Sequence, residues 1–125
     1  MCIRDRERLG ARLTLAEGLM FVAQSDEALA ALAAAVREWV GQGPAAAFRL
    51  AALYEMTTLT GSLGLALALA HQAMSLESVW TAAHIDEDFQ MRAWGVDAEA
   101  MARREQRFID MRAAAFMAHA TAVDP

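Results

Sequence analysis

The stretch from Met56 to Leu76 contains no Asp, Glu, Lys or Arg, and this absence of charge limits how the chain can fold. It continues the apolar pattern that begins at Phe48. On a helical wheel its leucines fall on every side: Leu59, Leu63, Leu65, Leu67 and Leu69. A helix that is apolar all round is buried, either in a protein core or in a membrane. We therefore predict one central helix from about Pro44 to Gln72.

The membrane alternative requires about 20 predominantly apolar residues. The uncharged stretch is long enough, but its clearly apolar part is only Leu63–Ala70, and no arginine cluster flanks it as a topology signal. Polar residues interrupt the remainder: Thr57, Thr58, Thr60, Ser62, His71 and Gln72. These features favour a helix buried in a soluble protein.

Composition agrees with a compact all-α helical bundle of one domain. The chain has 125 residues, 57% of them hydrophobic, which is enough for a core. Its net charge of −5 and lack of a basic cluster argue against nucleic acid as a partner. The single cysteine cannot form an internal disulfide, and Met1–Gly10 has no apolar run typical of a signal peptide. We expect a cytoplasmic monomer without a transmembrane segment.

Local signals divide the chain around the central helix. Residues 12–24 fit neither a helical nor a strand period, which predicts an irregular connector. A second helix should run from Leu76 to about Ala93 and stop at Gly95. Three side chains stand where helix N-caps are expected: Ser25, Ser75 and Asp97. For domain organisation we expect a non-native or truncated start at 1–7, one helical domain at 8–120 and a frayed tail at 121–125.

One acid interrupts the apolar pattern of the helix predicted after Ser75. If residues 76–93 form one helix, Glu87 falls between Trp80 and Trp94, with Asp86 and Gln90 at the margin of the same face. A buried Glu87 would need either an arginine from another helix, for which Arg49, Arg104 and Arg112 are candidates, or a bond to a backbone terminus. Alternatively, this face is open, and Glu87 is a charged anchor for a protein partner.

Enzyme chemistry has weak support in the sequence. The three histidines show no His-Glu-x-x-His spacing, so we predict no metal site, and no cofactor motif is present. The segment Thr60–Gly64 does not match the Gly-x-Ser-x-Gly nucleophile elbow, and we predict no catalytic residue. An enzyme should show a pocket with converging polar groups, whereas a binding protein should show an exposed apolar patch near Glu87.

The same stretches resemble the ATP-twelve family of F-type ATP synthase assembly chaperones. The resemblance lies in TLTGSLGLALALA at Thr58–Ala70, in Trp80, and in HIDEDFQMRAWGVDAEAMARR at His84–Arg104. It covers most of residues 8–120. It implies a non-enzymatic chaperone that binds the alpha subunit of the catalytic head and shields it until the beta subunit takes its place.

The resemblance also implies a site and a missing part. It makes Glu87, which matches the Glu of the family's motif, a functionally important position. Family members carry a mainly β domain ahead of the helical one, so this chain is expected to be the C-terminal helical part alone. The helical pattern and the resemblance together predict these partner-binding residues: Glu87, Asp86, Gln90, Trp80 and Trp94. A generic helical interaction domain remains the alternative.

Overall fold

The computed structural model describes residues 10–122, which form six α-helices and contain no strand, so the all-α prediction is confirmed. The expected truncated start at 1–7, and residues 123–125 of the expected tail, lie outside the described residues. The chain divides into two units, at residues 1–41 and 42–125. A single domain at 8–120 stays a prediction.

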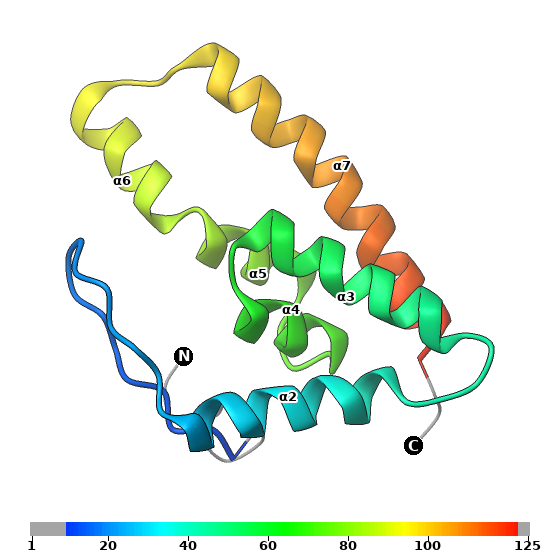
Figure 1. Ribbon diagram of the computed structural model, residues 1–125. Helices are drawn as coiled ribbons and strands as arrows, with labels where there is room; N and C mark the ends of the chain where they lie inside the picture. The colour runs from blue at the N-terminus through cyan, green and yellow to red at the C-terminus, as the bar shows by residue number, and fades with distance from the viewer. Residues whose placement is uncertain (1–9, 123–125) are drawn as a thin grey trace. The chain divides into compact units, whose positions relative to one another are not determined.

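The described part of the first unit is the predicted irregular segment followed by one helix, which begins after the N-cap expected at Ser25 (Figure 1). The Gln24 side chain bonds both backbone groups of Thr14, accepting from its N–H at 2.8 Å and donating to its carbonyl at 2.9 Å. Helix α2 spans Asp26–Val40. The Ser25 hydroxyl caps it by accepting from the Ala28 N–H at 3.1 Å, which satisfies one of the free amides of the first turn.

The second unit holds the remaining helices: α3 (Ala46–Thr60), α4 (Leu63–Ala70), α5 (Leu76–Ala83), α6 (Ile85–Trp94) and α7 (Ala98–Ala120). The long helix α7 runs beside α3, with α4 and α5 completing the bundle (Figure 1). Its fully buried side chains come from α3, α4, α5 and the C-terminal half of α7: Leu53, Met56, Leu67, Leu69, Val79 and Met111. None of the described helices combines the length and the apolar character that crossing a membrane requires.

The prediction of one continuous central helix is wrong, because the chain breaks at Gly61. Gly61 ends α3 in the left-handed conformation, with a φ of 68°, which glycine adopts without a steric penalty. The Ser62 hydroxyl then accepts from the Leu65 N–H at 3.2 Å and starts α4. Most of α4 is buried as predicted, whereas α3 buries one face and exposes Phe48 and Tyr54 on the other.

The second predicted helix also breaks, at His84. The backbone of His84 has a φ of −116° and a ψ of 17°, which ends α5 and begins α6. The His84 ring is buried, and its Nδ1 lies 2.7 Å from the carbonyl oxygen of Trp80. This local bond offers the backbone an alternative to the regular helical ladder. The break removes the continuous face on which the sequence placed Trp80 and Glu87.

Side-chain bonds to backbone carbonyls tie α7 to the neighbouring helices. The buried guanidinium of Arg49 donates to the carbonyls of Thr121 at 2.8 Å and Gln42 at 3.0 Å. Further along, Arg107 donates to the Leu59 carbonyl at 2.7 Å. Charged donors suit helix C-terminal carbonyls, which carry partial negative charge and lack a partner in their own helix.

Candidate partner-binding surface

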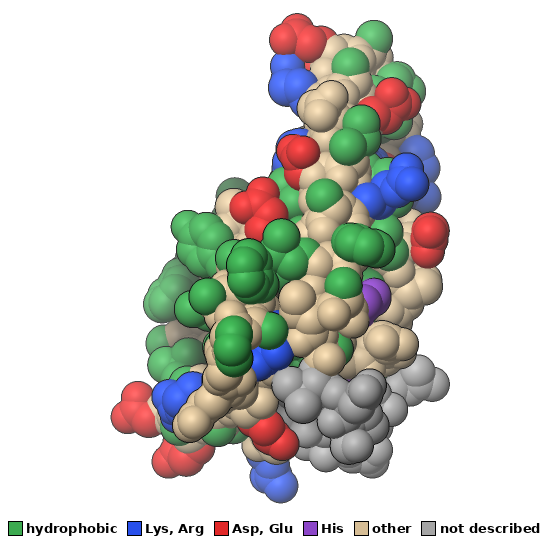
Figure 2. All heavy atoms as spheres, turned by 90° about the vertical axis from the view of Figure 1, so that its right-hand side faces the viewer, with side chains coloured by type: hydrophobic (Ala, Val, Ile, Leu, Met, Phe, Trp, Pro, Cys, Tyr) green, Lys and Arg blue, Asp and Glu red, His purple; other side chains and the backbone are tan. Residues whose placement is uncertain are grey.

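Helix α6 and residues 98–108 of α7, together called the arm, contribute no buried residue to the core. In Figure 1 the two segments extend past α3, α4 and α5, and a short loop joins them at the far end. The upper part of Figure 2 shows hydrophobic side chains lying between acids and arginines on this region. The arm therefore offers a second surface besides the one that packs the bundle.

Large apolar side chains are exposed along α6 and the loop that follows it. Trp94 is 88% exposed, and Ile85, Phe89 and Val96 are each more than half exposed. Isolated apolar residues on a surface are ordinary, but several on one short segment are typical of an interaction site. The sequence motif contains Ile85 and Phe89, but neither was predicted as a partner-binding residue. Their spacing of four residues in an acidic segment was the available signal.

Trp80 and Trp94 do not share a surface. Trp80 is 8% exposed, and its ring packs against His84 at 4.3 Å and Phe108 at 5.3 Å between centroids. The guanidinium carbon of Arg107 lies 6.0 Å from the centre of the same ring. Such a buried ring has little area to present to a partner. Trp80 therefore packs beneath the base of the arm, whereas Trp94 lies on the surface of the arm.

Glu87 is partly exposed, with 34% of its side chain accessible. Its Oε2 lies 3.9 Å from the Nε2 of the buried His84 ring. Of the candidate arginines, Arg49 donates to backbone carbonyls and Arg104 bonds Asp88 instead, with its Nη1 2.5 Å from Asp88 Oδ1. This hydrogen bond holds the pKa of Asp88 below its ordinary value. The expectation of a buried Glu87 paired with arginine is therefore wrong.

Within α6, helical geometry still groups part of the predicted set. Glu87 and Trp94 are seven residues apart, so they lie on nearly the same side of the helix, and Gln90 lies between them. Asp86 and Gln90 are both exposed, one turn apart. The structure thus brings together Glu87, Gln90, Trp94 and Asp86 on the arm, with Trp80 beneath it.

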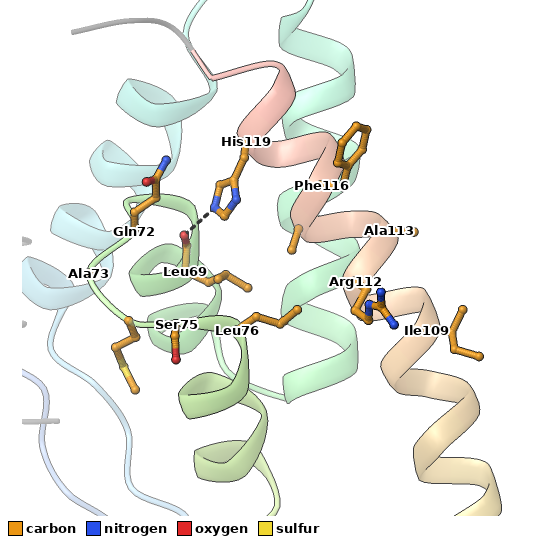
Figure 3. Close-up of a pocket in the computed structure, with 12 residues that line it drawn as sticks. Leu69, Gln72, Ala73, Ser75, Leu76, Ile109, Arg112, Ala113, Phe116 and His119 are labelled. Atoms are coloured by element: carbon orange, nitrogen blue, oxygen red, sulfur yellow. Dashed lines mark hydrogen bonds between the residues drawn. The ribbon is translucent and has the colours of Figure 1, made fainter.

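Neither of two hollows in the described part of the second unit assembles catalytic groups. A depression of about 310 Å³ between α5, α6 and α7 contains Asp88 and Arg104, which already bond each other. The larger hollow, about 870 Å³, lies between residues 69–76 and α7 (Figure 3). Its Ser75 hydroxyl bonds Ser78, and its His119 bonds the Leu69 carbonyl. Within residues 10–122 no three His, Cys, Asp or Glu side chains cluster closely enough for a metal ion.

Comparison with solved structures finds the same fold in longer proteins. A protein from Agrobacterium tumefaciens, described as a candidate chaperone, is 44% identical with a TM-score of 0.84. Atp12 from Paracoccus denitrificans is 33% identical with a TM-score of 0.83, and a mutant of that protein is 32% identical with the same score. Each match covers 94% of this chain, but only 42% of the Agrobacterium protein and 48% of the Paracoccus proteins. No protein-family model matches, and no curated protein does either.

Proposed function

Because this chain belongs to the ATP-twelve family, we propose that it is an assembly chaperone of the F-type ATP synthase. It corresponds to the C-terminal helical part of its solved relatives and spans less than half of their length. In this proposal the chain binds the alpha subunit of the catalytic head and shields it until the beta subunit takes its place. The role is non-enzymatic and belongs to the cytoplasm.

The exposed arm is the observation that carries the proposal. A chaperone for an unassembled subunit must cover an interface that another subunit later occupies. Protein interfaces combine aromatic and apolar contacts with a few charged groups that set orientation. The arm has this composition, since Phe89 and Trp94 are exposed and Asp86 and Glu87 lie on the same short helix.

The residues of the arm take different roles in this proposal. Trp94 and Phe89 supply apolar contact area, because large aromatic side chains contribute strongly to binding when a partner covers them. Glu87, Asp86 and Gln90 supply charge and hydrogen-bonding groups at the edge of that contact. Trp80 acts indirectly, because its packing on Phe108 joins α5 to the base of the arm.

Co-expression with the alpha subunit, followed by pull-down, tests the proposal. We expect the native chain to capture the alpha subunit and Glu87→Lys to reduce capture about tenfold, since one charge reversal at a contact costs on the order of 1.4 kcal/mol. Glu55→Lys is the matched control, because Glu55 is an exposed acid in the middle of α3. It should bind as the native chain does.

Circular dichroism of each variant separates loss of binding from loss of folding. A Glu87→Lys variant that is folded but fails to bind would support a contact through Glu87. Equal capture by both lysine variants would remove Glu87 from the contact. No capture by the folded native chain would contradict the proposal for this chain.

A further inference from the structure

The hollow between residues 69–76 and α7 is an open groove with one charged wall. In Figure 3, His119 extends from α7 toward Leu69, and Arg112 of the same helix also lines the hollow. Ile109 and Phe116 of α7 also line it and are more than half exposed. The His119 Nε2 lies 3.0 Å from the Leu69 carbonyl, which fixes the ring against the end of α4. The groove therefore combines apolar side chains with polar groups, and Arg112 is one of the residues that line it.

The charge of the groove is opposite to that of the chain. The protein carries a net charge of −5, yet no Asp or Glu is among the residues that line the groove. Arg112 is exposed and forms no ion pair with any residue in the range 10–122. A guanidinium stays charged at any physiological pH and binds carboxylates through paired N–H donors. The groove thus complements an apolar ligand that carries a negative charge.

We propose that this groove docks an amphipathic peptide segment of a protein partner, with one carboxylate on the apolar face of that segment. The wall from Ile109 to His119 is about 15 Å long at 1.5 Å per residue, which matches about three turns of a docked helix. The groove is open to solvent along one side, whereas small-molecule sites enclose most of their ligand. An open groove of this length therefore suits a peptide segment.

The docking groove is separate from the arm. The arm comprises α6 and residues 98–108, and the groove uses residues 69–76 and 109–119. A chaperone with both surfaces can hold a client at two places. The proposal does not depend on binding of the alpha subunit, so the two can be tested independently.

The test is an NMR titration of the full ¹⁵N-labelled chain with an acetylated peptide of about twelve residues, long enough for three helical turns. The peptide carries leucines along one face and a single Glu among them. A second peptide has Gln in place of that Glu. The protein variants are Arg112→Gln and Arg112→Glu, with Arg37→Glu as the control at an exposed arginine of α2. Sodium octanoate is added at the end as a competing apolar carboxylate.

We expect saturable shifts confined to residues 69–76 and 109–119. The Gln peptide and the Arg112→Gln variant should each bind about three- to fivefold more weakly, as for loss of an exposed ion pair. The Arg112→Glu variant should bind more weakly still, and Arg37→Glu should bind normally. Absence of saturable shifts, shifts centred on the arm, or equal affinity for both peptides would overturn the proposal. Displacement of the peptide by octanoate would assign the groove to a fatty acid and would also overturn it.

Discussion

Truncating the two tryptophans near the arm should have opposite consequences for stability and for binding. Trp80 is 8% exposed and packs on His84 and Phe108, whereas Trp94 is 88% exposed. Burying an indole removes roughly 150–250 Å² from water, which at about 25 cal/mol per Å² corresponds to about 4–6 kcal/mol. The true gain in free energy is smaller, because the unfolded chain is compact and already buries part of its apolar surface. We therefore expect Trp80→Ala to lower the free energy of unfolding by about 3–5 kcal/mol.

Trp94→Ala should change the free energy of unfolding by less than about 0.5 kcal/mol, because its side chain has little protein surface to lose. The assay is urea denaturation followed by circular dichroism at 222 nm, with a thermal scan as a second measure. At this chain length 1 kcal/mol corresponds to about 4 °C, so Trp80→Ala should lower Tm by about 12–20 °C. If the alanine variant does not fold, Trp80→Phe should lose about 1–3 kcal/mol by removing part of the ring.

In the pull-down assay the order of the two effects should be reversed, with the larger loss of binding at Trp94. Trp94→Ala should stay folded and capture less alpha subunit, whereas Trp80→Phe should keep most of the capture where it is folded. A single continuous helix from residue 76 to 93 would place both indoles on one face. Equal destabilisation by the two alanine variants would therefore refute the break at His84 and the reasoning built on it.

Two further predictions concern the helix break and the arm. Gly61→Ala should destabilise the fold by about 1–2 kcal/mol in urea denaturation, because its φ of 68° is unfavourable for a residue with a Cβ; an unchanged midpoint would contradict a left-handed Gly61. The hydrogen bond from Arg104 lowers the pKa of Asp88, so ionised Asp88 stabilises the folded state. This contribution to the free energy of unfolding is complete above the unfolded pKa of about 3.9 and is lost as pH falls through the folded pKa. Asp88→Asn should therefore make unfolding less dependent on pH below about pH 4, and an identical pH profile would argue against this ion pair.

The starts of α2, α5 and α7 could be read from the sequence because capping is local chemistry. Ser25, Ser75 and Asp97 each accept a hydrogen bond from an amide two or three residues ahead, as predicted. Such a bond needs only the cap residue and the first turn. The uncharged run also predicted burial correctly for α4, because transfer of apolar surface from water does not depend on the direction of the helix.

The two helix breaks were less predictable for different reasons. At Gly61 the sequence contains the signal, since a glycine followed by a serine can end one helix and cap the next. The uncharged stretch continues through Gly61 without a change in hydrophobicity, so the prediction treated it as one helix. At His84 the break depends on a histidine that is buried and bonded to the Trp80 carbonyl. A helical wheel assumes an unbroken helix, so it could not detect this change.

The sequence by itself determined the all-α class, the buried α4, the caps at Ser25, Ser75 and Asp97, and the family resemblance. Each of these depends on residue types or on residues a few positions apart. Tertiary structure alone decided that Trp80 is buried, because its neighbours Arg107 and Phe108 come from a helix far along the chain. It also decided that Arg104 bonds Asp88 and leaves Glu87 partly exposed. Those pairings follow from the direction in which α6 leaves α5 and approaches α7, and no local pattern contains that direction.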